Sequence, residues 1–222
     1  MIAIFDNDGT ICDSQEAEEY CFVTAVERVT GRSLPTHDWT SYEEPTSTAI
    51  IRALLEGDPE AQEKEMQIER EYLRLLEEAR PDFPGDFTPL PGAVEFIERL
   101  KEEGICSIGF ATGCFAATAG FKLQCCGVTL RDYPHATSSD TPRRREIIPL
   151  AAERAGYPTS AVVYFGDAPW DVRVSGILGI PMIGMGRRIE QLKALGVAHV
   201  FRDYSDADAI VSVLQTLKES ME

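Results

Sequence analysis

The chain has 222 residues and a mass of 24.6 kDa, and 44% of its residues are hydrophobic while 26% are charged. This is a globular composition, which excludes disordered, collagen-like and low-complexity proteins. Acidic residues outnumber basic ones by 37 to 21, for a formal net charge of −16, so we expect neither nucleic acids nor anionic membranes as partners. A small phosphorylated substrate is not excluded, because a bound cation can reverse the charge locally.

The cellular compartment is predicted from three absences in the sequence. No apolar run approaches the roughly 20 residues that span a bilayer. The N-terminus reaches an acidic residue at position 6, which is unlike a signal peptide. The six cysteines include no CxxC pair, so they do not indicate a disulfide framework. We therefore expect reduced thiols and a cytoplasmic protein, while the sequence leaves the oligomeric state unknown.

The first half of the chain is predicted to be one strand followed by a helical block. The strand is the apolar run at residues 2–5, and helices are predicted at 15–31, 45–57 and 58–80. Residues 80–92 contain four prolines and two glycines, the strongest linker signal in the chain. On the third helix, five residues trace one stripe, and all but the glutamate suit a buried face: Met66, Glu69, Tyr72, Leu73 and Leu76.

Beyond the linker, predicted strands and helices alternate. Strands are predicted at 105–111, 161–165, 181–183 and 198–201, and helices at 93–103, 116–123, 144–155, 170–178, 188–195 and 206–218. This rhythm predicts an α/β fold, a Rossmann-like doubly wound parallel sheet with helices on both faces. The helical block then reads as an inserted all-helical cap. The predicted boundaries are 1–13 and 87–222 for the core and 14–86 for the cap, which would form a lid over the edge of the sheet.

Acidic, hydroxyl and glycine residues follow three of the predicted core strands, where ligands of open α/β sheets bind. In chain order they are Asp6, Asp8, Thr112, Gly113, Asp167 and Asp171. Clustered carboxylates repel one another, so their convergence implies a hard cation, and oxygen ligands suit Mg²⁺. The Asp-x-Asp-Gly run could alternatively be an ordinary turn. It does not fit an EF-hand loop, which needs Asp or Asn at its fifth position and Gly at its sixth, where Thr10 and Ile11 stand.

These segments resemble the haloacid dehalogenase (HAD) superfamily, in its subclass with a C1-type helical cap. The matching segments are IFDNDGTICDS (4–14), GFATG (109–113) and VVYFGDAPWD (162–171), and TPLPGAVEFIERLKEEG before the second of them is also typical of the family. The resemblance implies a phosphatase that hydrolyses a small phosphorylated metabolite. In it, Asp6 would be the nucleophile that forms an aspartyl-phosphate, and Asp8 the general acid and then the general base.

The resemblance also implies the phosphate and metal ligands. Thr112 would hydrogen-bond a phosphoryl oxygen, beside the backbone N–H groups of the turn at Gly113. Mg²⁺ would be bound by Asp6, by the backbone carbonyl of Asp8 and by Asp167. Asp171 would be a direct or indirect partner of the metal. Such a site suits phosphoryl transfer, which needs mainly positioning and charge compensation.

The family's remaining cation is usually a lysine near the start of a later helix. No lysine lies between residues 127 and 156, but Arg143, Arg144 and Arg145 precede the helix predicted there. We assign the role to this cluster and favour Arg144 by its spacing to the helix, since arginine binds phosphate bidentately. The alternative is a solvated basic helix start.

The substrate is not predicted by any motif. Trp39, Tyr42 and Arg52 of the insert are candidate substrate contacts, or else core or surface residues. A phosphomutase remains an alternative, because it keeps both aspartates of the first motif and differs mainly in the cap. A phosphate-binding or scaffold protein on the same fold is the alternative without catalysis.

Overall fold

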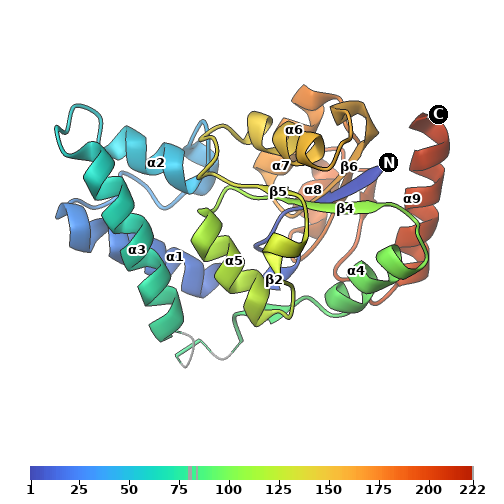
Figure 1. The fold of residues 1–222 in the computed structure, drawn as a ribbon, viewed down its shortest axis with the longest axis horizontal. Coiled ribbons are helices and arrows are strands. Elements are labelled where there is room, and N and C mark those ends of the chain that lie inside the picture. Colours follow the sequence, from blue (N-terminus) through green and yellow to red (C-terminus); the bar gives the residue numbers. More distant parts are fainter. Residues whose placement is uncertain (80–81, 84, 222) are drawn as a thin grey trace.

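The computed structural model describes residues 1–79, 82–83 and 85–221. An α/β core and a helical unit lie side by side in it (Figure 1). The predicted end of the third helix at Arg80, and Pro81 and Pro84 of the predicted linker, lie outside the described residues. Six parallel strands form one sheet in the order β5-β4-β1-β6-β7-β8. They are β1 (Ile2–Phe5), β4 (Ser107–Ala111), β5 (His135–Ala136), β6 (Val162–Gly166), β7 (Met182–Gly184) and β8 (His199–Val200).

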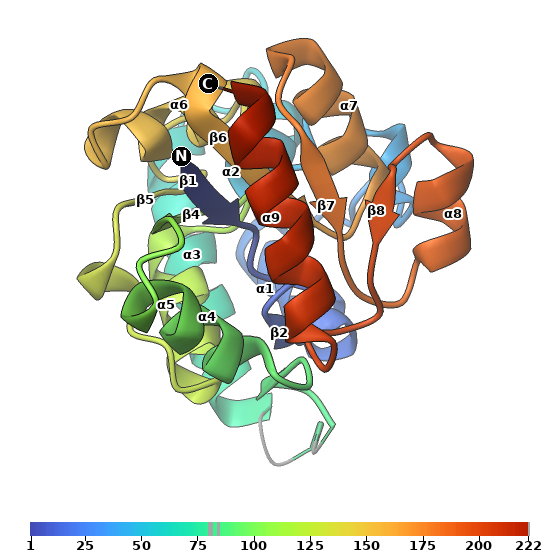
Figure 2. The same cartoon turned by 90° about the vertical axis from the view of Figure 1, so that its right-hand side faces the viewer.

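Helices cover both faces of this sheet (Figure 2). Alternate residues of β1 explain the two layers, because side chains of a strand point to opposite faces in turn. Ala3 and Phe5 pack in a cluster with α4 (Ala93–Glu102) and α9 (Ala207–Met221). Ile2 and Ile4 pack in another cluster with α6 (Arg144–Arg154) and α7 (Pro169–Leu178). The predicted fold class is therefore confirmed. The helices of the core are α4 (Ala93–Glu102), α5 (Ala116–Cys125), α6 (Arg144–Arg154), α7 (Pro169–Leu178), α8 (Ile189–Ala194) and α9 (Ala207–Met221).

The helical unit, called the cap here, has a core of its own. It contains α1 (Gln15–Thr30), α2 (Ser47–Leu54) and α3 (Ala61–Ala79). Their buried side chains form a separate cluster, which Phe115 at the start of α5 joins from the core. The predicted stripe on α3 is wrong for Met66, which is 47% exposed, although Tyr72 and Leu76 are fully buried. The buried face is offset because it starts at Ile68 rather than at Met66.

The two chain segments that join core and cap pair with each other. β2 (Cys12–Asp13) and β3 (Thr88–Pro89) form an antiparallel ribbon that the sequence did not predict. A strand of two residues is too short to show the hydrophobic alternation from which strands are predicted. The residue boundaries of core and cap given above stay a prediction.

Candidate active site

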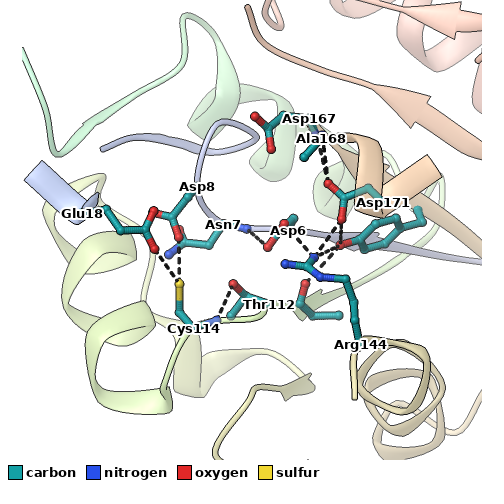
Figure 3. A network of polar contacts seen from close by, with 12 residues as sticks. Asp6, Asn7, Asp8, Glu18, Thr112, Cys114, Arg144, Asp167, Ala168 and Asp171 are labelled. Atoms are coloured by element: carbon teal, nitrogen blue, oxygen red, sulfur yellow. Dashed lines mark hydrogen bonds and ion pairs between the residues drawn. The ribbon is translucent and has the colours of Figure 1, made fainter. Parts of the chain in front are cut away.

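The central strand β1 places the first site residues beside those of its two neighbours. Phe5 pairs in register with Phe110 of β4 and with Phe165 of β6. All three strands run in the same direction, so the residues after them meet at one edge of the sheet. The backbone N–H of Asp6 donates to the carbonyl of Phe165 at 2.9 Å. Figure 3 shows Asp6 between Thr112 on one side and Asp171 on the other.

A tight turn after β1 separates Asp6 from Asp8. The carbonyl of Asn7 accepts hydrogen bonds from the backbone N–H groups of residues 10, 11 and 12. Gly9 has a φ of 72°, a left-handed conformation that glycine adopts without steric cost. The turn sends the side chain of Asp8 away from Asp6 and toward Glu18 and Cys114 (Figure 3).

Three carboxylates converge at the centre of the site. Asp6, Asp167 and Asp171 are buried, and each offers an oxygen within 4.8 Å of the other two. Burial raises the pKa of Asp167 well above its usual value, against the opposing charge of Arg188. Burial likewise raises the pKa of Asp171 to about 6, although Arg144 opposes the shift. Three buried carboxylates disfavour joint ionisation, so this oxygen donor set fits a divalent cation.

Asp171 is held by hydrogen bonds on both carboxylate oxygens. One oxygen accepts from the backbone N–H groups of Asp167 at 3.2 Å and Ala168 at 3.0 Å. The other accepts from Arg144 at 2.8 Å and from the Tyr164 hydroxyl at 3.2 Å. These contacts fix its orientation and suit a residue that positions the site. The backbone of Gly166 must pass close by, since a Cβ there would lie 2.7 Å from Asp171 Cγ.

Of the three consecutive arginines, the structure brings Arg144 into the site. Its Nη1 lies 3.0 Å from an oxygen of Asp6 and 2.8 Å from one of Asp171. Arg143 and Arg145 are exposed. A Cβ at Gly113 would lie 2.7 Å from Arg144 Nη2, so a side chain there would displace this guanidinium. The Nε of Arg144 is buried and has no hydrogen-bond partner within the described part of the chain.

A second cluster surrounds Asp8, with Lys122 of α5 at its centre. The Nζ of Lys122 lies 2.6 Å from an oxygen of Asp8, 3.0 Å from Glu18 and 3.1 Å from the Cys114 sulfur. The Ser14 hydroxyl also donates to Asp8. Burial would raise the pKa of Asp8, but the charge of Lys122, with hydrogen bonds from Cys114, Lys122 and Ser14, holds it below its usual value.

Lys122 was missed by the sequence analysis, although a signal existed. It is the one charged residue in the ten-residue helix α5, and a single cation on an otherwise apolar helix suggests a buried ion pair. Its side chain is fully buried.

Replacing Lys122 by methionine should lower the free energy of unfolding by about 3 kcal/mol, because Asp8 and Glu18 would be left as partly buried carboxylates without a cation. Denaturant unfolding measures the change. Lys101→Met is the matched control, since Lys101 is exposed on α4 and should change the free energy by less than about 0.5 kcal/mol. Equal values for the two variants would contradict a structural role for the buried pair.

A cavity of about 190 Å³ lies between the two clusters and the cap. Of the candidate substrate contacts, Trp39 lines it. Tyr42 instead stacks on Trp39 with ring centroids 6.0 Å apart, and Arg52 pairs with Glu65 on the cap surface. The residues that line the cavity are Asp6, Asp8, Glu18, Glu19, Phe22, Trp39, Pro45, Ser47, Ile50, Thr112, Gly113, Cys114, Arg144, Asp167, Trp170 and Arg188.

The cap contacts the loops of the core through the N-terminal end of α2 and its N-cap residue Thr46. The backbone N–H of Ser47 donates to the carbonyl of Gly113 at 2.8 Å. The hydroxyls of Thr46 and Thr48 donate to the carbonyls of Pro142 and Ser138, at 2.7 and 2.8 Å. These contacts hold the cap against the loops that follow the strands, so the cap forms one wall of the cavity.

The comparison with known families agrees with this geometry. The family model of the haloacid dehalogenase-like hydrolases matches residues 1–174, from β1 into α7. The chain belongs to this family. The predicted family and enzyme class, a HAD-like hydrolase, are thereby confirmed. In this hydrolase the acidic cluster at the strand ends could bind a divalent metal. No helix in the described ranges is long and apolar enough to cross a membrane.

Individual relatives of this HAD-like hydrolase are distant in sequence. It is 25% identical to phosphoglycolate phosphatase of Agrobacterium fabrum (strain C58) over 189 residues, which are 83% of this chain and 79% of the relative. CbbY from Rhodobacter sphaeroides, solved in complex with phosphate, is 15% identical with a TM-score of 0.71, over 92% of this chain and 95% of that one. β-Phosphoglucomutase from Clostridium difficile is 17% identical with a TM-score of 0.68, over 97% and 98%. The two structures show the shared fold.

Proposed function

We propose that this hydrolase is a Mg²⁺-dependent phosphatase that cleaves small phosphate monoesters through a phosphoryl group carried on Asp6. The observation that supports it most is the convergence of Asp6, Thr112 and Asp167 from three strand ends, with Arg144 bonded to Asp6 at 3.0 Å. A buried carboxylate beside a guanidinium can attack a phosphorus atom whose oxygens the same guanidinium holds. The phosphatase among its relatives is consistent with this chemistry.

The proposed reaction has two steps. An oxygen of Asp6 attacks the phosphorus, and the bond from phosphorus to the alcohol oxygen breaks while Asp8 gives that oxygen a proton. Water then attacks the same phosphorus, Asp8 takes its proton, and the bond to Asp6 breaks to release inorganic phosphate. Thr112 and Arg144 would hold the phosphoryl oxygens in both steps.

The residues that would hold Mg²⁺ are Asp6, Asp167 and the backbone carbonyl of Asp8. Asp171 would be a direct or indirect partner of the metal. The cation would supply positive charge that lets the carboxylate of Asp6 approach an anionic substrate.

Lys122 has a different effect, since its charge lowers the pKa of Asp8. This favours the ionised form of Asp8 that the second step requires and opposes the protonated form that the first step requires.

Phosphate release from an aryl phosphate should require Mg²⁺, cease in excess EDTA and return when Mg²⁺ is restored. Ca²⁺ should inhibit, because it takes more ligands at longer distances and would permit a bidentate Asp6 that cannot attack in line. A colorimetric phosphate assay with each cation tests both statements. Full activity in excess EDTA would contradict the metal assignment.

Asp8→Ala should slow the first step more for an alkyl phosphate than for an aryl phosphate, because the poorer leaving group needs the proton more. We expect a loss on the order of 10² to 10⁴ for the alkyl ester and clearly less for the aryl ester. The rate of phosphorylation of Asp6, measured by rapid quench, is the proper comparison, since overall turnover also contains the base-catalysed step. Equal losses would assign the proton transfer to another residue.

A phosphomutase would share the first step and differ in the acceptor of the phosphoryl group. The two activities are separated by offering a hexose phosphate and measuring free phosphate beside sugar isomers. Release of phosphate supports the phosphatase, whereas isomerisation without release supports the mutase. Binding of phosphate esters without either product would indicate the phosphate-binding alternative.

A further inference from the structure

The cavity has a core end and a cap end that differ in their charged groups. The core end holds arginines and aspartates together: Arg144, Arg188, Asp6, Asp8 and Asp167. The phosphoryl group of the proposed reaction would lie at this end, beside Thr112. Arg144 is 6% exposed and its unpartnered Nε leaves a hydrogen bond for a ligand. Among the described residues that line the other end, those from the cap include no lysine, arginine or histidine. They are Glu18, Glu19, Phe22, Trp39, Pro45, Ser47 and Ile50.

The two cap carboxylates differ in how their charge is balanced. Glu18 is bonded to the fully buried Lys122 at 3.0 Å. Glu19 has the ring nitrogens of His37 at 3.3 Å and of Trp39 at 3.4 Å. Neither ring is a permanent cation, and the Glu19 side chain is 45% exposed, so its negative charge is open both to solvent and to a ligand in the cavity.

Aromatic rings stand beside this charge. The rings of Phe22 and Trp39 meet edge to face with centroids 6.0 Å apart. Trp39 is held in place by its stacking on Tyr42 and by the hydrogen bond that its indole N–H donates to Glu19. Aromatic rings next to a carboxylate attract a cation through the ring quadrupole as well as through charge. A carboxylate in the same place would face Glu19 with no cation from the cap to balance it.

We propose that the substrate is a small phosphate monoester whose alcohol part carries a positively charged amine, recognised by Glu19, Trp39 and Phe22. This inference rests on the proposed phosphatase function. The same cavity of about 190 Å³ is lined by Asp6 and Thr112 of the core and by Glu19 of the cap, so one small ester can contact both ends.

Three esters of similar size separate charge from shape: 2-aminoethyl phosphate, propyl phosphate and 2-phosphoglycolate. For the unaltered protein we expect kcat/KM for the aminoethyl ester to exceed that for the propyl ester by about tenfold, with phosphoglycolate the poorest. Equal values for the three esters, alongside hydrolysis of an aryl phosphate, would overturn the inference and leave the phosphatase intact. No turnover of any ester, the aryl phosphate included, would overturn both.

Variants of Glu19 test the assignment to this residue. Glu19→Gln keeps the shape and should lower the ratio of kcat/KM for aminoethyl over propyl phosphate by about tenfold, and Glu19→Lys should move the preference toward phosphoglycolate. Glu16→Gln is the matched control, because Glu16 is an exposed acid on the same helix outside the cavity, and the ratio should not change. An unchanged ratio in Glu19→Gln would overturn the inference.

Discussion

Asp6→Asn should reduce phosphate release by on the order of 10⁴-fold or more, since an amide cannot attack phosphorus and no other group takes over a lost nucleophile. The protein should still fold. Removing one of three buried carboxylates lowers the electrostatic repulsion among them. The amide oxygen of asparagine can still accept a hydrogen bond from Arg144. Phosphate release and thermal unfolding, measured on the same sample, check the two statements.

Asp132→Asn is the control for Asp6→Asn, because it removes an exposed acid outside the cavity. Its activity and melting temperature should stay close to those of the parent. Activity of Asp6→Asn within about tenfold of the parent would remove Asp6 as the nucleophile.

Arg144→Met should cost both activity and stability. We expect kcat/KM to fall by about 10²- to 10³-fold, the usual loss of a charged donor to a reacting oxyanion. The free energy of unfolding of the metal-free protein should fall by about 3 kcal/mol or more, because Asp6 and Asp171 would lose their buried cation. Added Mg²⁺ should restore part of that stability by binding the folded state. Denaturant unfolding with and without Mg²⁺ measures it.

The neighbouring arginines provide matched controls for this variant. Arg143→Met and Arg145→Met remove the same charge from exposed positions and should change kcat/KM by less than about threefold. Arg144→Lys keeps the charge without the planar fork and should recover only part of the activity. A larger loss in Arg143→Met or Arg145→Met than in Arg144→Met would show that the wrong arginine was assigned.

Much of the core could be predicted because its strands are short apolar runs that end in polar residues. The run at 2–5 is buried on both faces, as expected of a central parallel strand. The polar residues that stop each run are also the ones brought together at one edge of the sheet. The position of the site therefore follows from the pattern of strands.

The contacts that complete the site depend on how distant segments pack together, which sequence periodicity does not predict. Lys122 reaches Asp8 across 114 positions of the chain, and Glu19 reaches the cavity only because the cap folds over it. A helical stripe gives the direction of a face to within about one residue, which is why it predicted Tyr72 correctly and Met66 wrongly. The identity of the cavity lining needed the structure.

The central claim is that the phosphoryl group passes through Asp6, and chemical trapping tests it most directly. The Asp8→Ala variant, mixed with an aryl phosphate and Mg²⁺, should accumulate the phosphorylated protein because its second step is slowed. Borohydride reduces an acyl phosphate but not a free carboxylate, so mass spectrometry of the N-terminal peptide should find residue 6 reduced to the alcohol. Reduction at no residue, or at a residue other than Asp6, while phosphate is still being released would contradict the account.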